Sequence, residues 1–475
     1  MGEMTVPAEA LYGASTQRAV ENFPISGRAV PASVIHAYGH LKAACAEVNH
    51  DLGRLNTARR DAIVKAATEV ATAKHDRHFP IDVFQTGSGT STNMNANEVI
   101  ANLVCIARGS AIGSTKDPAY IGDARSGSGV HPNDHVNMGQ SSNDTFPTAI
   151  HLAGALALHN DLLPALDRLT RRLEDLAMRW DKLIKIGRTH LQDATPIRLG
   201  QEFSGYAQQA RYGMERARRA LHVLCELPIG GTAVGTGINA HEEFGKRVCE
   251  RLAAALGLPF REATNHFEAQ HAKDAVVEAS GHLKTIAVSL SKIAGDIRLM
   301  GCGPRCGLGE LKIPAVQPGS SIMPGKVNPV IIEAVLMVCC RVIGNDACVT
   351  VAGLGGVGGV LDLHVAMPVM AEALLESAQL LARACVVFDD KLLSGLEADA
   401  ERCKELIEGS LAMCTSLVPA IGYDKSAALA KQAFKEGKTV RQLALEQKLL
   451  PEDQLNALLD PWSMTLPGGE GSAGG

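Results

Sequence analysis

Residues 162–176 read Leu-Leu-Pro-Ala-Leu-Asp-Arg-Leu-Thr-Arg-Arg-Leu-Glu-Asp-Leu, and the leucines recur at steps of four and three residues. This spacing places one apolar stripe on an α-helix, made by Leu162, Leu166, Leu169, Leu173 and Leu176. A second stripe has the same spacing and consists of Leu283, Ile286, Leu290, Ile293 and Ile297. Helical patterns extend over about residues 145–185, 266–300 and 330–350, whereas alternating strand patterns are nearly absent. The sequence therefore predicts an all-α fold with an elongated helical bundle at its centre.

The chain has 475 residues, which is enough for two or three domains with large cores. Its 46 Lys and Arg residues against 51 Asp and Glu residues give a formal charge of −5, without long runs of one sign. This balance gives no electrostatic reason to expect nucleic acid or an anionic membrane surface as a partner. A small-molecule ligand is the prediction.

The twelve cysteines lack the paired spacing of metal sites and read as reduced thiols of an intracellular protein. Residues 1–7 contain neither an apolar signal core nor an Arg-rich presequence, and no apolar run is expected to reach membrane-spanning length. These features predict a cytoplasmic protein.

Aromatic residues form only 4% of the chain, whereas apolar residues form 46%. Long helices of this composition carry more than one apolar stripe, and a slender bundle can bury the second stripe only against another subunit. The composition therefore predicts a homo-oligomer.

Residues 319–329 read Gly-Ser-Ser-Ile-Met-Pro-Gly-Lys-Val-Asn-Pro and combine two hydroxyls, an ammonium group and a carboxamide. Asn328 and Pro329 are predicted to be the N-cap and the first residue of the helix that follows, so that its N-terminus points into the same space. This loop is predicted to hold a carboxylate beside a possible base.

Two glycine-rich stretches imitate nucleotide-binding motifs but have the wrong spacing. Five residues separate Gly319 from Gly325, and Val327 instead of Ser or Thr follows Lys326, which excludes a P-loop. No strand of a βαβ unit precedes residues 230–237, which read as a turn-rich break between helices. No nucleotide cofactor is expected.

Three more segments are rich in hydroxyl and amide side chains, and they span residues 85–95, 131–144 and 187–196. Each taken alone also fits a helix-capping turn. The second segment holds about ten polar residues, which is more than a capping box requires, and the third holds His190, a candidate for acid–base chemistry near neutral pH. Because the candidates are hydroxyls, amides and one histidine, no metal is expected.

Together the four segments resemble the conserved regions of the fumarase/aspartase superfamily of lyases, in the same order and over about residues 6–461. His190 and the run Ser141-Ser142-Asn143-Asp144 resemble the class II fumarase branch, whereas aspartases carry Gln and Ser-Thr-Asn-Asp at these positions. Residues 422–431 resemble the small C-terminal fumarase domain. The resemblance implies a metal-independent hydratase that needs no cofactor and adds water reversibly, in the anti sense, to fumarate to give (S)-malate, a citric acid cycle reaction.

For the architecture, the resemblance implies an N-terminal domain over residues 1–138, a central helical bundle over 139–394 and a small helical domain with a floppy tail over 395–475. Four bundles would form the core of a homotetramer whose active sites are shared between three subunits. Residues 301–329, rich in Gly and Pro, are expected to act as a lid over the substrate.

For the chemistry, the resemblance implies that Ser320 takes a proton from carbon and that Lys326 stabilises the charge that develops. His190, oriented by Glu333, would act on the opposite face of the substrate. The residues implied to contact the substrate are Ser88, Gly89, Thr90, Ser141, Ser142, Asn143, Thr189, Ser321, Lys326, Val327 and Asn328.

A second, non-catalytic dicarboxylate site of the family corresponds to residues 131–134, which are His131, Pro132, Asn133 and Asp134. The chain departs from the family here. Residues 125–130 read Arg-Ser-Gly-Ser-Gly-Val, so the basic residue that the family has next to the motif is missing. It departs again at residues 361–368, where His364 and Met367 replace the family's usual residues and are expected to alter helix packing.

Two alternatives remain at this stage. One keeps the fold but changes the leaving group, as in aspartate ammonia-lyase or another fumarate-releasing lyase. The other is a catalytically silent structural protein, like the lens crystallins of this superfamily.

Overall fold

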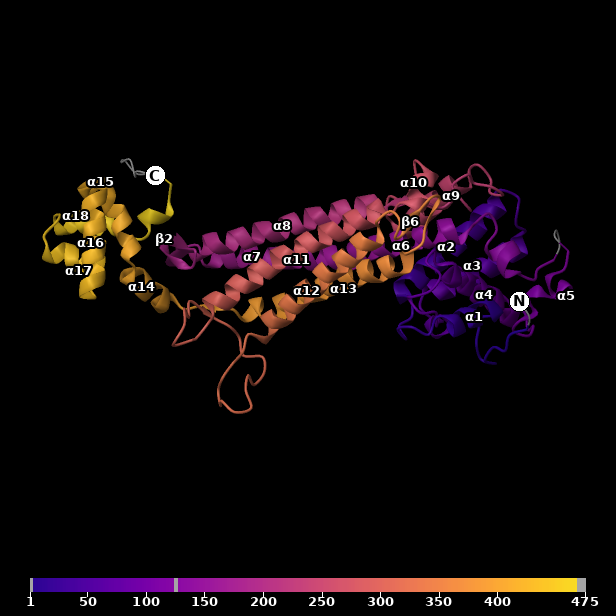
Figure 1. The fold of residues 1–475 in the computed structure, drawn as a ribbon, viewed down its shortest axis with the longest axis horizontal. Coiled ribbons are helices and arrows are strands. Elements are labelled where there is room, and N and C mark those ends of the chain that lie inside the picture. Colours follow the sequence, from indigo (N-terminus) through magenta and orange to yellow (C-terminus); the bar gives the residue numbers. More distant parts are fainter. Residues whose placement is uncertain (1–2, 124–126, 468–475) are drawn as a thin grey trace. The chain divides into compact units, whose positions relative to one another are not determined.

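The computed structural model describes residues 3–123 and 127–467, and helices dominate it (Figure 1). The predicted all-α class is confirmed. In chain order the α-helices are α1 (Ala14–Asn22), α2 (Ala32–Asp51), α3 (Thr57–Ala71), α4 (Thr90–Ala107), α5 (Pro118–Ile121), α6 (Ser142–Ala157), α7 (Leu163–Arg179), α8 (Leu199–Leu224), α9 (Phe244–Leu256), α10 (His266–His271), α11 (Asp274–Met300), α12 (Val330–Ala352), α13 (Met367–Lys391), α14 (Ala400–Gly409), α15 (Val418–Ile421), α16 (Tyr423–Glu436), α17 (Val440–Glu446) and α18 (Glu452–Leu458).

The long helices match the leucine pattern, with two interruptions. The helix predicted from residue 145 to residue 185 begins at Ser142, passes through a π-helical turn at Leu158–Leu162 and ends at Arg179. The stretch predicted from residue 266 breaks after α10, and α11 begins at Asp274. Helix boundaries are the least certain part of a pattern-based prediction, because the apolar stripe continues across a local break.

Other short helical turns are η1 (Asp76–His78), η2 (Ser114–Lys116), η3 (Pro132–Val136), η5 (Leu393–Gly395), η6 (Leu411–Leu417) and η7 (Ser463–Thr465). The strands are β1 (Ile184–Thr189), β2 (Gln192–Arg198), β3 (Glu226–Leu227), β4 (Arg261–Glu262), β5 (Leu311–Lys312), β6 (Gly359–Val360), β7 (Leu363–His364) and β8 (Glu397–Ala398). They form two-stranded pairs, antiparallel in β1–β2, β5–β8 and β6–β7 and parallel in β3–β4.

The chain forms two compact units. The first comprises residues 1–164, 215–287 and 338–382, and the second comprises residues 165–214, 288–337 and 383–475. This division differs from the three parts predicted from the resemblance, which remain a prediction. The expected tail at residues 468–475 lies outside the described residues.

In the first unit, α2 is a largely buried helix that packs against α3 and α6. Tyr38 and Leu41 of α2 are fully buried, and the Tyr38 ring lies 6.3 Å from the ring of Phe146 on α6. α2 therefore supports the beginning of α6, where one of the predicted polar segments ends.

In the second unit, the helices after residue 400 surround a core of their own. It consists of Ile186, Ile407, Met413, Leu417, Leu429, Ala433, Val440, Leu443, Ala444, Leu455 and Leu459. Since Ile186 belongs to β1, the hairpin formed by β1 and β2 is anchored in this core.

Helix α12 corrects one expectation. Its 23 residues are long and apolar enough to span a membrane, although no run of this length was expected, and only 33% of its most apolar window is buried within the chain. One such helix is weak evidence for a membrane span, because core helices of soluble proteins have the same composition. It leaves Met337, Ile343 and Val351 exposed on the chain's own surface.

Candidate active site

The structure brings two of the predicted polar segments together in the first unit. The Thr90 hydroxyl lies 2.8 Å from the Ser88 hydroxyl and 2.8 Å from the Ser142 hydroxyl, although Ser142 is 52 residues further along the chain. Ser88, Thr90 and Ser142 are named the hydroxyl cluster below. Hydroxyls at the beginnings of two helices, α4 and α6, suit an anionic ligand.

Two glycines beside this cluster are required by close packing. Gly89 is the N-cap residue of α4 with φ +71°, and a Cβ there would lie 2.1 Å from the ring of Phe146. A Cβ at Gly87 would lie 1.7 Å from the carbonyl oxygen of Val365. Only glycine fits either position, so the segment's glycines serve packing as well as ligand access.

The beginning of α6 is fixed by a capping box. The Ser141 hydroxyl accepts the N–H of Asn143 (3.2 Å), and Asp144 accepts the N–H of Ser141 (2.9 Å). Asp144 is fully buried and also accepts the N–H of Thr232 (2.9 Å), while the Asn143 amide donates to the Ala233 carbonyl (2.8 Å). Burial raises the pKa of Asp144 to about 6. The glycine-rich stretch 230–237, predicted to be a helix break, thus holds the start of α6.

Lys42 is a residue that the sequence analysis missed. It is fully buried on α2, and its ammonium donates to the side-chain oxygens of Asn93 (2.8 Å), Asn137 (3.0 Å) and Gln140 (2.9 Å). These three amides explain part of the polar excess in segments 85–95 and 131–144. The available signal was a single lysine among the apolar residues on the buried side of a helix, where a charge needs partners.

The predicted second dicarboxylate site forms a π-helical turn. Pro132, Asn133 and Asp134 lie in η3, and the ring Nδ1 of His131 caps the turn, 3.1 Å from the N–H of Asp134. His131 and Pro132 are largely buried, whereas Asn133 and Asp134 are exposed.

A basic residue near this turn comes from α3. The buried Arg59 donates to the backbone carbonyls of Gly129 (3.0 Å) and Ile121 (3.0 Å). Burial lowers the pKa of His135 to about 4, and the Arg59 charge adds to this shift. Arg125 and Ser126, part of the departure noted in the sequence, lie outside the described residues.

In the second unit, residues 319–329 form a loop that closes on itself. The half-buried Ser320 hydroxyl accepts the N–H groups of Met323 (3.0 Å) and Ile322 (3.3 Å), and the Gly319 N–H donates to the Lys326 carbonyl (2.9 Å). Two backbone donors on one hydroxyl oxygen would also stabilise that oxygen as an anion.

The predicted N-cap at this loop is wrong. α12 begins at Val330, the carbonyl of Pro329 accepts the helical N–H of Glu333 (3.1 Å), and the Asn328 amide donates to the Gly319 carbonyl (2.6 Å). Asn328 therefore closes the base of the loop and does not cap the helix.

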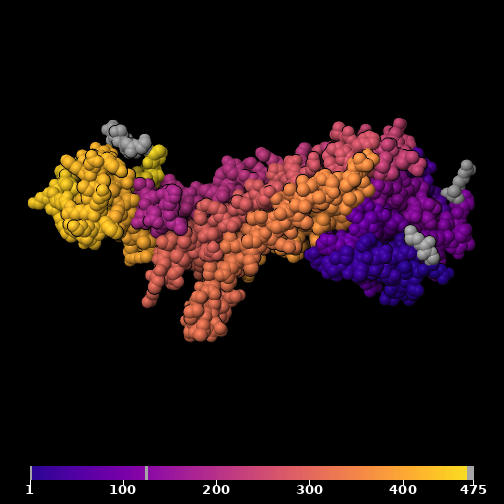
Figure 2. All heavy atoms as spheres, in the orientation of Figure 1, coloured from indigo at the N-terminus to yellow at the C-terminus, as the bar shows by residue number. Residues whose placement is uncertain are grey.

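The loop borders a cavity of about 440 Å³, lined by Ala315, Val316, Gln317, Pro318, Gly319, Ser320, Gly325, Lys326 and Val327. Figures 1 and 2 show this part of the chain, between α11 and α12, extending away from the helices. Ser321, Lys326 and Val327 are exposed there. The loop therefore presents its polar groups outward from its own chain.

His190 lies at the tip of the β1–β2 hairpin. His190 and Leu191 form the two-residue turn with φ of +55° and +61°, and Thr189 and His190 are exposed. Close to the tip of the hairpin, Arg188 donates to Glu310 (2.8 Å), which is fully buried. This ion pair, also missed from the sequence, ties the His190 hairpin to the chain that leads toward the Ser320 loop.

Glu333 lies in the first turn of α12 and is exposed. Within the described part of the chain, no hydrogen bond or ion pair joins the side chains of His190, Ser320, Lys326 and Glu333 to one another. The predicted pairing of His190 with Glu333 thus stays a prediction.

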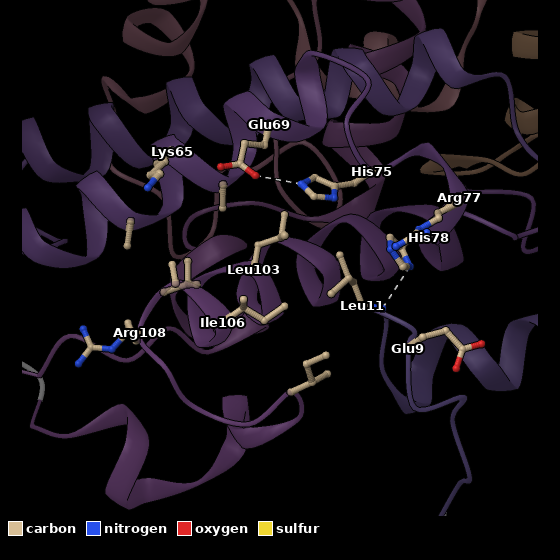
Figure 3. Close-up of a pocket in the computed structure, with 15 residues that line it drawn as sticks. Glu9, Leu11, Lys65, Glu69, His75, Arg77, His78, Leu103, Ile106 and Arg108 are labelled. Atoms are coloured by element: carbon tan, nitrogen blue, oxygen red, sulfur yellow. Dashed lines mark hydrogen bonds and ion pairs between the residues drawn. The ribbon is translucent and has the colours of Figure 1, made fainter.

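The described residues also contain a cavity of about 510 Å³ in the first unit that none of the predicted residues lines (Figure 3). Leu11, Leu103 and Ile106 form part of its apolar wall, and His75 pairs with Glu69 (3.0 Å) at its edge. Over residues 3–123 and 127–467 there is no group of three or more His, Cys, Asp or Glu side chains that could hold a metal.

Comparisons with known proteins agree over almost the whole chain. Residues 2–344 match a family described as Lyase, and residues 413–466 match one described as Fumarase C C-terminus. The "Fumarate hydratase class II" of Corynebacterium efficiens is 52% identical over 98% of this chain and 95% of its own, and that of Halobacterium salinarum is 51% identical over 98% and 96%. The crystal structure of class II fumarase from Schistosoma mansoni superposes with a TM-score of 0.91 at 38% identity, covering 98% of both chains.

Proposed function

Because the chain belongs to the lyase family that includes these class II fumarate hydratases, we propose that it is a hydro-lyase that adds water to fumarate reversibly, in the anti sense, to give (S)-malate. The observation that carries the proposal is the match to class II fumarate hydratases over 98% of the chain. Such an activity is a step of the citric acid cycle.

In the malate-to-fumarate direction, a base removes a proton from the carbon next to a carboxylate. The resulting species carries extra charge on that carboxylate, so catalysis needs both a base and concentrated donors. Ser320 is proposed as the base in its alkoxide form, which the N–H groups of Ile322 and Met323 stabilise. Lys326 and Asn328 come from the same loop and are proposed to hold the carboxylate.

The hydroxyl leaves on the opposite face as water. His190, at a hairpin tip, is proposed to give it a proton, and in hydration to take one from the attacking water. Glu333 is proposed to orient His190. Both side chains are exposed within one chain, which supports a pairing completed between subunits.

The proposed substrate contacts come from all four polar segments. They are Ser88, Gly89, Thr90, Ser141, Ser142, Asn143, Thr189, Ser321, Lys326, Val327 and Asn328. The contact among the hydroxyls of Ser88, Thr90 and Ser142 supports a common role for these three residues in binding the substrate. Residues 131–134 are proposed as a second dicarboxylate site with a lower affinity than the active site. The basic residue near it, Arg59, already donates hydrogen bonds to backbone carbonyls.

A homotetramer with active sites shared between three subunits is proposed. Apolar side chains on the long helices support it, because Val288 of α11, Met337 and Val351 of α12, and Val387 of α13 are at least 40% exposed in the single chain. Burying them requires another copy of the chain.

The remaining predictions are part of the same proposal. The three domains are expected over residues 1–138, 139–394 and 395–475, and residues 301–329 are expected to close over the substrate as a lid. A cytoplasmic location is supported by the twelve cysteines, which are all free thiols.

The test follows the ultraviolet absorbance of fumarate after the purified protein is added, with and without a chelator. A fall in absorbance that the chelator does not change supports a metal-independent hydratase. Release of ammonia from aspartate without hydration of fumarate would instead assign an ammonia-lyase. A folded tetramer that is silent with both substrates would be a structural protein.

A further inference from the structure

Lys42 is the one buried ammonium group beneath the hydroxyl cluster in the part of the chain that the structure describes. Its three hydrogen-bond partners come from different places: Asn93 lies in the first turn of α4, Asn137 follows η3, and Gln140 directly precedes the capping box of α6. The lysine on α2 therefore ties together the two segments that carry Ser88, Thr90 and Ser142.

The orientation of these amides is fixed by their own donors. The Asn137 amide N–H₂ donates to the Gln140 carbonyl (3.1 Å), that of Gln140 donates to the Val136 carbonyl (3.1 Å), and that of Asn93 donates to the Asn137 side-chain oxygen (3.2 Å). Their oxygens must therefore face Lys42. An ammonium supplies three donors for three oxygens, whereas a neutral amine has only two N–H bonds and would leave one oxygen facing a lone pair. The geometry thus fits the charged form.

The groups around Lys42 do not neutralise this charge by direct contact. Tyr38 presents its ring 5.7 Å from the ammonium, Cys45 is a buried thiol on the same helix, and Asp144 spends its oxygens on backbone N–H groups. No carboxylate forms an ion pair with Lys42 within residues 3–123 and 127–467. Burial lowers the pKa of Lys42 to about 7, and the nearby Cys45 and Asp144 oppose that shift.

A buried cation held only by neutral amides is stabilised by any anion that arrives nearby, since charges interact strongly away from water. The same segments carry the hydroxyls of Thr90 and Ser142, which are only partly buried and so can reach a ligand. Thr145 links the amides around Lys42 to the start of α6, because its hydroxyl lies 3.2 Å from the Asn93 side-chain oxygen and 2.8 Å from the Ser141 carbonyl.

We propose that Lys42 is a positioning residue of the dicarboxylate site. Its ammonium holds residues 88–93 and 137–142 in one arrangement, and its charge, which no direct ion pair neutralises, attracts the substrate carboxylate that binds at the hydroxyl cluster. This inference rests on the proposed function, and it adds a determinant of substrate affinity that does not touch the substrate.

The test compares Lys42→Met with the parent protein as full-length chains. The methionine keeps the length of the side chain and removes its donors and charge. The KM for fumarate and the Kd for succinate, measured by calorimetry, are expected to rise about tenfold, while kcat changes by less than about threefold. The matched control is Lys65→Met on the exposed face of α3, which is expected to match the parent.

A second variant separates charge from packing. Gln140→Glu keeps the size of the side chain and an oxygen acceptor beside the ammonium, but it neutralises the charge and loses the N–H₂ donor to the Val136 carbonyl. A rise in the Kd for succinate of about fivefold or more is expected. Gln140→Met loses the same donor without adding a charge, and a Kd as high as that of Gln140→Glu would assign the effect to lost hydrogen bonds and overturn the charge argument. Gln140→Glu also serves if Lys42→Met does not fold.

The readouts separate this inference from the proposed function. Turnover by the parent protein decides the function, and succinate affinity decides the role of Lys42 whether or not turnover is seen. If folded Lys42→Met and Gln140→Glu bind succinate as the parent does, or if the parent does not bind succinate at all, the proposal for Lys42 is overturned.

Discussion

Residues 85–95 and residues 319–329 look alike in sequence, because both combine glycines with hydroxyl and amide side chains, but they fold in opposite ways. The first segment enters a helix, its polar groups bond to Lys42 and to one another, and the ring of Phe146 packs against Gly89. The second is a loop that bonds mainly to itself, with Ile322 83% exposed. The part of the proposed site at residues 85–95 is therefore already arranged within the single chain, whereas the part at residues 319–329 has few contacts outside its own loop.

The difference has an energetic basis. Burying the polar groups of residues 85–95 is tolerated only because nearly every one has a partner. The loop leaves its groups in water at little cost, and it can give up that hydration when a carboxylate or another subunit arrives.

Replacing Ser320 by alanine tests whether the loop contributes to catalysis without contributing to the stability of the fold. Loss of the base is expected to lower kcat about 10³-fold. The melting temperature should stay within about 1 °C of the parent, because the side chain bonds only within its own loop. The fumarate absorbance assay and a thermal melt measure the two quantities. A melting temperature several degrees lower would mean that the loop is part of the folded core.

Alanine at Gly89 and at Gly325 gives a matched pair, since both glycines have positive φ (+71° and +80°). A Cβ at Gly89 would collide with Phe146, whereas a Cβ at Gly325 meets nothing within 4 Å. We expect Gly89→Ala to lower the free energy of unfolding by about 3–5 kcal/mol and Gly325→Ala by about 1 kcal/mol. Urea unfolding measures both. Equal losses would show that the two segments are packed alike.

Acid should unfold the region around α4 and α6, which carries the hydroxyl cluster, before it affects the loop of residues 319–329. His151 is buried on α6, beside the Glu226 carbonyl (2.6 Å), and burial lowers its pKa to about 4. The unfolded chain binds this proton below about pH 6.5, so stability is complete above that value and falls as the pH drops toward 4, by up to about 3 kcal/mol.

His151→Gln is the variant that isolates this contribution, and urea unfolding between pH 7 and pH 4 should show a shallower loss of stability than in the parent. His190→Gln is the control, because its side chain is exposed at a hairpin tip, and its pH dependence of stability should match the parent. Identical pH profiles for all three proteins would remove His151 from the account.

Ligand should order the loop more than the helix start. Succinate is expected to slow hydrogen exchange of the amides of residues 319–329 about tenfold, whereas residues 93–97, whose amides are already hydrogen-bonded in α4, should change less than about twofold. Exchange followed by mass spectrometry tests this. Equal slowing in both segments would contradict the preformed state of the hydroxyl cluster.

Particular residues show how far the sequence led. The leucine stripe from Leu162 to Leu176 predicted α7, because its apolar residues are neighbours along one helix and need no knowledge of the rest of the fold. The π-helical turn before α7 was not predicted, since the apolar spacing runs through it without a signal.

The site divides in the same way. The candidate hydroxyls were recognised from local composition, but the partners of Lys42 are 51 to 98 residues away in sequence and those of Glu310 are more than 100 residues away. A buried charge gains its partners only when distant segments pack, so no local pattern announces them.

The sequence by itself determined that this protein is helical, that its polar chemistry lies in four short segments and which lyases it resembles, because these properties are written in spacing and residue type. Only the tertiary structure decided which segments meet. It shows that the hydroxyls of Thr90 and Ser142 are in contact and that Asn328 bonds to the Gly319 carbonyl and does not cap a helix. It also shows that the buried Lys42 binds Asn93 in the first turn of α4. Such contacts depend on how helices pack, and packing is a property of the whole chain.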